Sequence, residues 1–342
     1  MIWWIIRSIF LVIKEKYIQV SKVKIVILDG YTLNPGDLNW DELRRLGDCE
    51  IHDRTPADQI IDRARDAEIL LTNKTPLNRE SIFALDKLKY IGVMATGYNI
   101  VDIQAAAERN IVVTNVPTYG TRSVAQMTLA LILELTQHVG LHSQAVRRGE
   151  WVRSLDWSFW QKPLIELEGL TAGIIGLGRI GRATANLLHA FGMEIIAFDP
   201  SIVDENPDNI VIHELESVLK NSDFLCLHCP LTADTDQFIN KKRLQQMKKE
   251  SYLINTSRGQ LINEQDLADA LNAELIAGAA LDVLSTEPPH PDNPLLGAKN
   301  CIITPHIAWA TKAARKRLMG IVVKNVKSFI NGACVNRVYL NK

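Results

Sequence analysis

Residues 171–199 have the sequence TAGIIGLGRIGRATANLLHAFGMEIIAFD. The stretch begins with a mostly apolar run that predicts a buried strand over 171–175, and three glycines with the spacing G-x-G-x-x-G follow it. Apolar residues then recur at helical spacing over 179–191, and a second strand is predicted over 194–198, directly before Asp199. This order of strand, glycine turn, helix, strand and acid is typical of a dinucleotide-binding unit.

Each glycine of this turn has a physical reason. Gly176 permits the tight turn, Gly178 lets the backbone approach a pyrophosphate, and Gly181 lets the helix pack closely on the strand. The N–H groups at the start of the helix favour phosphates. The Asp199 carboxylate can accept both hydroxyls of the adenosine ribose and would repel a 2′-phosphate, so we expect NAD rather than NADP. The alternative is a glycine-rich turn in an ordinary strand–helix unit.

Length and composition limit the possible classes of protein. A chain of 342 residues with 47% hydrophobic residues predicts two domains with sizeable cores. The net charge of -1, without a Lys/Arg-rich block, argues against nucleic acid as a partner. Five scattered cysteines are typical of reduced thiols and favour a cytoplasmic protein.

One group of side chains could suggest zinc. Cys226, His228 and Cys229 form a C-x-H-C pattern within the apolar segment FLCLHCP. No second pair of ligands lies near them in the sequence, and the segment has the pattern of a buried strand. We therefore expect core cysteines and no metal.

The first 22 residues form an extra segment. Its apolar part, MIWWIIRSIFLVIKEKYIQV, is interrupted by Arg7, and the uncharged run is too short to span a bilayer. A signal-peptide cleavage pattern is lacking. Our hypothesis is a start codon assigned too early, with translation beginning at Val23. The alternative is a peripheral amphipathic anchor, and in either case we expect no stable membrane insertion.

The remaining chain predicts an α/β fold of two doubly wound parallel-sheet domains, an NAD-binding Rossmann domain inserted into a smaller flavodoxin-like substrate domain. Strands and helices alternate through the first domain, and the second contains a predicted sheet of six or seven strands. A helix predicted over 311–331 returns to the first domain. The expected boundaries are 23–118 and 306–342 for the substrate domain and 119–305 for the Rossmann domain.

Two segments near the start of the predicted Rossmann domain have distinct patterns. A long apolar helix is predicted from Val124 to about His138, with Thr121 or Ser123 as its cap. The segment 151–163 then contains three tryptophans and a phenylalanine within ten positions. It is either a loop packed on its own domain or an arm that reaches a second subunit, because clustered aromatics are common interface anchors. The second alternative predicts a homodimer.

Polar residues that follow predicted strands suggest a reaction. Hydride transfer to a carbonyl requires polarisation of the C=O group and a proton for the oxygen. Arg258 can polarise the carbonyl and hold a carboxylate, and His306 can supply the proton because histidine titrates nearest neutrality. Glu287 would orient the imidazole and favour its protonated form. Each residue alone also has a structural explanation, but their combination with Asp282 at the strand ends of one sheet favours catalysis.

Several segments together resemble the D-isomer-specific 2-hydroxyacid dehydrogenases, and the resemblance covers nearly all of residues 23–340. It implies a small 2-keto or 2-hydroxy acid substrate, with hydride transfer between nicotinamide C4 and the C2 carbon. The segments are GLGRIGRATANLLHAFGMEIIAFDP, LINTSRGQLINEQDL, ALDVLSTEPP and ITPHIAWAT.

The resemblance also implies roles for single residues. Arg258, Glu287 and His306 would be catalytic, with His306 as the acid/base. The substrate carboxylate would bind the backbone N–H groups of Thr96 and Gly97, with Arg258 and His306 also binding substrate. Residues implied in cofactor binding are Gly176, Gly178, Arg179, Ile180, Gly181, Asp199, Cys229, Pro230, Thr256, Arg258, Asp282 and His306. Of these, Asp282 would contact the nicotinamide carboxamide, and Cys229 and Pro230 would flank the adenosine.

Within the family, three segments are most similar to members that interconvert D-glycerate and hydroxypyruvate: ILDGYTLNPGDLNWDELRRLG, GVMATGYNIVD and PTYGTRSVAQ. Two alternatives remain open. The substrate could be glyoxylate or another 2-keto acid, since side-chain selectivity depends on the shape of the pocket. The chain could also be an NAD-sensing binding module of the corepressor type, which can retain the same three residues.

Overall fold

The computed structural model describes residues 22–202 and 210–339. The chain divides into two units, one formed by its two ends up to Tyr119 and from Lys312, the other by Gly120–Thr311. Residues 306–311, which we expected in the substrate domain, lie with the second unit, because the Asp282 carboxylate accepts hydrogen bonds from the backbone that follows residue 306. Residues 1–21, to which the start-codon hypothesis applies, lie outside the described ranges.

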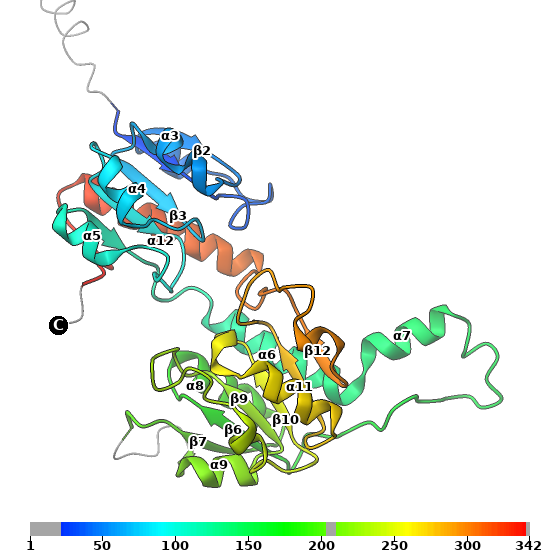
Figure 1. Cartoon of the computed structure of the whole chain (residues 1–342). Helices are drawn as coiled ribbons and strands as arrows, with labels where there is room; N and C mark the ends of the chain where they lie inside the picture. The colour runs from blue at the N-terminus through cyan, green and yellow to red at the C-terminus, as the bar shows by residue number, and fades with distance from the viewer. Residues whose placement is uncertain (1–21, 203–209, 340–342) are drawn as a thin grey trace, which may run out of the picture. The chain divides into compact units, whose positions relative to one another are not determined.

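The first unit is an α/β domain. Its elements are β1 (Lys24–Ile27), α2 (Asp41–Arg44), β2 (Asp48–Ile51), η1 (Ala57–Gln59), α3 (Ile60–Ala64), β3 (Ile69–Thr72), α4 (Arg79–Ala84), β4 (Tyr90–Val93), α5 (Ile103–Glu108), β5 (Val112–Thr114) and α12 (Lys312–Ile330). The strands form a five-stranded parallel sheet in the order β2-β1-β3-β4-β5, which is flavodoxin-like. Helices α3, α4 and α5 pack on one face and α12 lies on the other (Figure 1).

Helix α12 completes this domain although it is distant in sequence. The Phe329 ring packs on the buried Tyr90 ring of β4, with 4.7 Å between ring centroids. At the other end of the helix, the buried Arg315 guanidinium donates two hydrogen bonds to the Asp37 carboxylate, at 2.6 and 2.7 Å. The two ends of the chain therefore share one core.

The second unit contains a seven-stranded parallel sheet, at the upper end of our expectation. Its elements are α6 (Thr121–Gln137), α7 (Val139–Arg147), β6 (Thr171–Ile175), α8 (Arg179–Ala190), β7 (Glu194–Phe198), β8 (Val211–Ile212), α9 (Leu215–Asn221), β9 (Phe224–Leu227), α10 (Lys241–Leu244), β10 (Tyr252–Asn255), η3 (Gly259–Leu261), α11 (Glu264–Asn272), β11 (Gly278–Leu281), η4 (Pro294–Gly297) and β12 (Cys301–Ile303). The strand order is β12-β11-β10-β9-β6-β7-β8, so strands are added towards one edge from β6 to β8 and towards the other edge from β9 to β12. The order therefore reverses between the neighbouring parallel strands β6 and β9.

Two hydrophobic clusters cover the two faces of this sheet. Helices α6 and α8 pack on one face and α9, α10 and α11 on the other, which confirms the doubly wound arrangement. Strands buried on both faces require nearly continuous apolar sequences, and β9 and β11 have them. In such sheets ligands bind beyond the carboxyl ends of the strands, near the point where the strand order reverses.

Helix α6 differs from the prediction at its start. It begins at Thr121 with Gly120 as its N-cap, so neither Thr121 nor Ser123 is the cap. The Ser123 hydroxyl instead lies 2.7 Å from the hydroxyl of Thr311. At the other end, His138 adopts a left-handed conformation and α7 follows at 55° to α6. Within the described ranges, no single helix is long and apolar enough to cross a membrane. Helices α6 and α7 reach the necessary length and hydrophobicity only when they are counted together across their bend.

Candidate active site

The three glycines after β6 have different surroundings. Gly176 has a φ of +91°, and a Cβ added there would lie 2.5 Å from the backbone nitrogen of Cys229. A Cβ at Gly181 would lie 2.2 Å from the backbone oxygen of Gly176. At Gly178, no described atom lies within 4 Å of an added Cβ, so the fold itself leaves room for a side chain. Open space above this backbone fits the close approach of a pyrophosphate.

Helix α8 starts directly behind this open backbone. Its N-cap is Gly178, which provides no side-chain acceptor. The first-turn N–H groups of Ile180 and Gly181 have no acceptor within the helix, and they carry the positive end of the helix dipole. The residues present therefore fit a dinucleotide whose phosphates lie at this helix start.

Asp199 follows β7 and is joined to the glycine turn. Its Oδ2 accepts a hydrogen bond from the backbone N–H of Leu177 at 2.8 Å, and its Oδ1 accepts from the N–H and hydroxyl of Ser201. Burial alone would raise the pKa of Asp199, but the donors of Ser201 and Leu177 and the charge of Arg182 hold it below its ordinary value. Three of about four acceptor positions are occupied, so accepting two ribose hydroxyls would require displacing one of these donors.

The ends of β9 and β10 form the opposite side of the turn. The Cys229 carbonyl accepts a hydrogen bond from the Ser257 hydroxyl at 2.8 Å, and the Pro230 carbonyl accepts from the hydroxyl of Thr235. The hydroxyl of the buried Thr256 lies 3.0 Å from that of Thr128 on α6. The resemblance placed cofactor contacts at Cys229, Pro230 and Thr256, and the structure places these residues at the carboxyl ends of the strands beside Gly176.

His306 and Glu287 meet directly. The Nδ1 atom of His306 lies 2.6 Å from Oε2 of Glu287. An ionised carboxylate only accepts hydrogen bonds, so Nδ1 is the donor and Nε2 is left to exchange a proton with a ligand. Both side chains are about 30% exposed, at 28% and 31%, which makes them accessible from solvent. This is the arrangement of an oriented general acid/base.

Asp282 organises the loop that carries His306. It is 1% exposed, and its carboxylate accepts hydrogen bonds from the Thr304 hydroxyl and from the backbone N–H groups of Ile307 and Ala308, at 2.6 to 2.9 Å. Its carbonyl also accepts from the N–H of His306 at 2.8 Å. His306 has a φ of +53°, a left-handed conformation that is uncommon outside glycine. The bonds to Asp282 on both sides of His306 maintain this conformation.

Arg258 lies at the same edge of the sheet but is not joined to the pair. Its side chain is exposed, and Nη1 donates to the carbonyl of Ser257 at 2.7 Å. The buried Asn255 side chain holds the turn, because it donates to the carbonyl of Arg258 and accepts from the N–H of Ser257. Sequence reasoning missed Asn255 as a site residue, although a polar residue ending an otherwise apolar strand was a usable signal.

The predicted substrate residues Thr96 and Gly97 follow β4 in the first unit. The Thr96 hydroxyl donates to the Val116 carbonyl at 2.8 Å, and the Asn115 side chain donates to the Thr96 carbonyl at 2.7 Å. These bonds hold the turn, while no described residue accepts from the backbone N–H groups of Thr96 and Gly97. Two unpaired backbone donors in sequence suit a carboxylate.

The C-x-H-C pattern is part of the β9 core. Cys226 packs with the cluster on the α6 face and Cys229 with the cluster on the opposite face. Burial raises the pKa of Cys226 to about 12 and lowers that of His228 to about 4. Among the described residues, no group of three or more His, Cys, Asp or Glu side chains is arranged to hold a metal.

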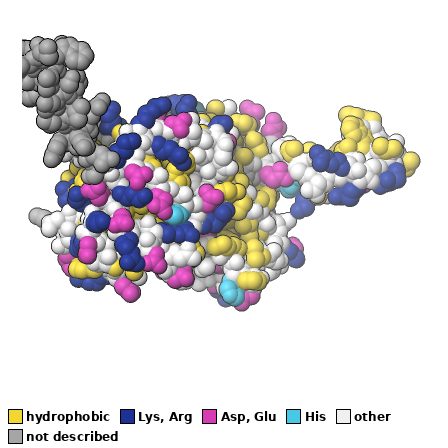
Figure 2. All heavy atoms as spheres, turned by 90° about the horizontal axis from the view of Figure 1, so that it is seen from above, with side chains coloured by type: hydrophobic (Ala, Val, Ile, Leu, Met, Phe, Trp, Pro, Cys, Tyr) yellow, Lys and Arg dark blue, Asp and Glu magenta, His cyan; other side chains and the backbone are white. Residues whose placement is uncertain are grey.

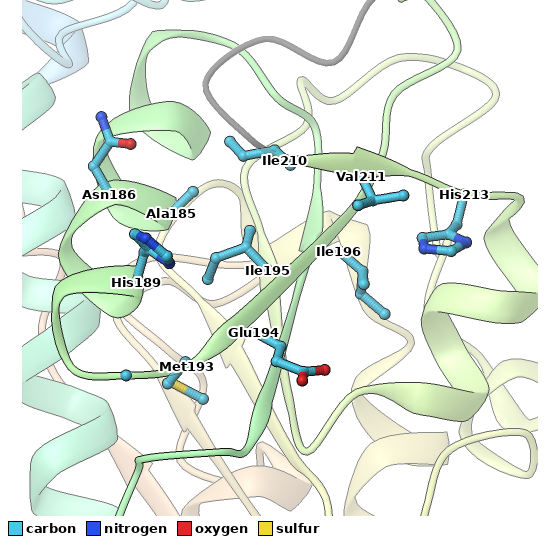
Figure 3. Close-up of a pocket in the computed structure, with 11 residues that line it drawn as sticks. Ala185, Asn186, His189, Met193, Glu194, Ile195, Ile196, Ile210, Val211 and His213 are labelled. Carbon is cyan, nitrogen blue, oxygen red and sulfur yellow. The ribbon is translucent and has the colours of Figure 1, made fainter.

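A cavity of about 540 Å³ lies elsewhere, between the second half of α8 and the β7–β8 edge (Figure 3). Its lining includes His189 from α8 and His213 just after β8. It also includes Glu194, the first residue of β7, whereas Asp199 follows the last. The cavity is thus at the amino end of the sheet, away from the glycine turn, and contains none of the predicted site residues.

The site therefore combines a dinucleotide-binding turn with an oriented histidine on one sheet. The chain belongs to the D-isomer specific 2-hydroxyacid dehydrogenase family, whose NAD binding domain matches residues 129–308. NAD is the cofactor of this domain.

Three similar proteins can be compared with this chain individually. A hydroxypyruvate reductase of Blautia hydrogenotrophica is 51% identical over 92% of this chain and 99% of its own. A glycerate dehydrogenase of Methylorubrum extorquens is 38% identical over 82% of this chain and 88% of its own. The solved structure of an NADPH-dependent glyoxylate/hydroxypyruvate reductase of Sinorhizobium meliloti, with NADP and malonate, has a TM-score of 0.79 at 31% identity, covering 93% and 97% of the two chains.

Proposed function

We propose that this chain is an NAD(H)-dependent D-2-hydroxyacid dehydrogenase that interconverts hydroxypyruvate and D-glycerate, the activity of a glycerate dehydrogenase or hydroxypyruvate reductase. The observation that carries the proposal is the contact between His306 Nδ1 and Glu287 Oε2 on the sheet that also holds the glycine turn. The likeness to a hydroxypyruvate reductase at 51% identity supports the choice of substrate.

Gly176–Gly181 and Asp199 would hold NADH, which would supply the hydride for the keto carbon. His306 delivers the proton to the keto oxygen from Nε2, while Glu287 holds Nδ1 and so keeps the imidazole oriented. The Arg258 guanidinium polarises the carbonyl and can hold the substrate carboxylate. Within the first unit, the backbone N–H groups of Thr96 and Gly97 are our candidates for binding a carboxylate. Asp282 holds the His306 loop and has acceptor capacity left for the nicotinamide carboxamide.

The test is the decrease in NADH absorbance with hydroxypyruvate, glyoxylate and pyruvate as separate substrates. We expect turnover with hydroxypyruvate and the highest kcat/KM for it. A higher kcat/KM for glyoxylate or pyruvate would keep the enzyme class and overturn the substrate. Tight NADH binding without turnover of any of the three would overturn the enzymatic function in favour of a nucleotide-sensing binding module.

We also propose a homodimer formed through the arm, which we define as α7 and residues 148–164. The arm extends from the second unit, and apolar side chains gather towards its tip (Figures 1 and 2). Val152 and Trp157 are 89% and 88% exposed, which is unusual for large apolar side chains. The arm has a defined conformation, since Trp151 Nε1 donates to the Trp157 carbonyl and the Gln161 N–H donates to His142 Nε2. An ordered, apolar extension suits burial against a second copy of the chain.

We propose the cytoplasm as the location of this protein. Its five cysteines are all free, including the exposed Cys334. Free thiols are maintained in reducing compartments. Labelling of intact and lysed cells with a membrane-impermeant thiol reagent tests this, and labelling in intact cells would contradict it.

A further inference from the structure

Glu287 lies on an exposed loop, so its position against His306 needs a cause. The loop follows β11 and runs through residues 284–293 before η4. Glu287 binds the start of this loop, because its Oε1 accepts a hydrogen bond from the N–H of Leu284 at 3.2 Å. The direction of the Glu287 carboxylate therefore depends on where Leu284 and Ser285 are held.

Glu264, the first residue of α11, holds the loop at two points. Its Oε1 accepts a hydrogen bond from the backbone N–H of Ser285 at 2.7 Å. Its Oε2 accepts from the side-chain amide of Asn293 at 2.8 Å. Because Ser285 and Asn293 lie near opposite ends of the loop, one carboxylate fixes both, and Glu287 lies between them.

The backbone of Ser285 is also bound from the Arg258 side. The Gln260 side-chain amide donates to the Ser285 carbonyl at 2.8 Å. A Cβ added to Gly259 would lie 1.9 Å from the carbonyl carbon of Leu284, so the two backbones are in direct contact. The segment that carries Arg258 and the loop that carries Glu287 are thus joined at Ser285, with Glu264 on its N–H and Gln260 on its C=O.

We propose that Glu264 is a positioning residue of the reaction: by binding Ser285 and Asn293 it holds the Glu287 carboxylate against the His306 imidazole. The inference rests on the proposed function, because orientation of His306 matters only if it exchanges a proton with substrate. A purely structural alternative is an acid in the first turn of α11 that interacts with the helix dipole. The positioning role predicts that loss of Glu264 acts through Glu287, whereas the structural alternative does not.

The test is a double-mutant cycle on the full-length protein with hydroxypyruvate at saturating NADH. We expect Glu264→Ala to lower kcat about 10- to 100-fold, the size of effect that misplacement of a catalytic group produces. NADH affinity, measured by fluorescence, should stay unchanged. In a Glu287→Gln background, Glu264→Ala should cost less than about twofold more.

Two further variants serve as a control and as a substitute. Asp266→Asn is the matched control on the same helix. The Asp266 carboxylate accepts a hydrogen bond from the backbone N–H of Lys241, and it makes none to the loop 284–293. It should change kcat by no more than about twofold. Should Glu264→Ala lose its folded state in a thermal melt, Glu264→Gln replaces it, since glutamine keeps an acceptor for Ser285 but not for the Asn293 amide.

Two results would overturn the inference: an unchanged kcat in a folded Glu264 variant, or losses that multiply fully in the Glu287→Gln background. Absence of turnover in the unmodified protein would instead contradict the proposed function, so the two failures are distinguishable.

Discussion

The backbone N–H of Leu177 donates to Oδ2 of Asp199 over 2.8 Å, which joins the glycine turn to the end of the following strand. The acid that would meet the adenosine ribose is therefore fixed by the turn that would meet the phosphates. Its lowered pKa keeps it ionised at neutral pH.

This charge predicts a preference for NADH over NADPH. We expect Asp199→Asn, which removes the charge and keeps the shape, to reduce the ratio of kcat/KM for NADH to that for NADPH about tenfold, equivalent to about 1.4 kcal/mol. Steady-state kinetics with both cofactors measure the ratio. A ratio that does not change would show that the carboxylate does not select the cofactor.

The glycine turn predicts opposite outcomes for two similar substitutions. Gly178→Ala has open space for its methyl group, so we expect an unchanged melting temperature but NADH affinity at least about tenfold weaker. Gly176→Ala meets backbone and a positive φ, so it should destabilise the fold by about 1–3 kcal/mol. Thermal melts and fluorescence titration separate the two effects. Normal NADH binding by Gly178→Ala would contradict the close approach of the pyrophosphate.

The resemblance implies a cofactor contact for His306, but we expect its loss to act on the chemical step. His306→Ala should lower kcat about 10²- to 10⁴-fold, the usual contribution of a general acid, while the dissociation constant for NADH stays the same. Stopped-flow turnover and fluorescence titration measure the two quantities. Equal losses in both would place His306 in cofactor binding instead.

His228 predicts a pH dependence of stability. Burial lowers its pKa to about 4, and Nε2 has no hydrogen-bond partner among the described residues. The unfolded chain binds this proton near pH 6.5, so below that pH the unfolded state binds more protons than the folded state. The contribution is fully present above about pH 6.5 and is lost as the pH falls towards 4. Between pH 7 and 5 we expect a loss of about 2 kcal/mol from this group.

Urea unfolding at the two pH values checks this prediction. His228→Gln should show a smaller decrease in unfolding free energy than the unmodified chain, whereas His189→Gln, at an exposed position, should not. The same decrease in all three proteins would exclude His228 as its source.

The arm predicts a specific effect on assembly. Charges at the exposed Leu155 and Trp157, introduced as Leu155→Glu and Trp157→Glu, should weaken the dimer at least 100-fold, because buried aromatic anchors dominate interface energies. Phe83→Glu, which alters an exposed aromatic outside the arm, serves as the control. Light scattering across a concentration series gives the dissociation constant. A monomer in the unmodified protein would contradict the proposed dimer.

Local sequence was sufficient where local interactions decide the structure. The strands predicted over 171–175 and 194–198 have the bounds of β6 and β7, because apolar strands next to a glycine turn leave few alternatives. The start of α6 could not be predicted in this way. Ser123 is a good cap by type, but its hydroxyl meets Thr311, which is 188 positions away.

The candidate site shows the same difference between local and distant interactions. The motifs identified His306 and Glu287, and the structure places them in contact. They did not identify Glu264 as part of the site, because its role depends on a loop that returns to it after 21 and 29 residues. Helix α7 was not predicted either, and among its residues only Ala145 is buried.

The split construction of the first unit has a consequence for synthesis. The nucleotide-binding unit is one continuous segment, so it can fold once residue 311 has left the ribosome. The five strands of the first unit emerge earlier, yet the Tyr90 face of their sheet stays uncovered until Phe329 of α12 arrives. The first unit is therefore synthesised first but completes its fold last. Its apolar sheet face must be protected from aggregation until α12 has been synthesised.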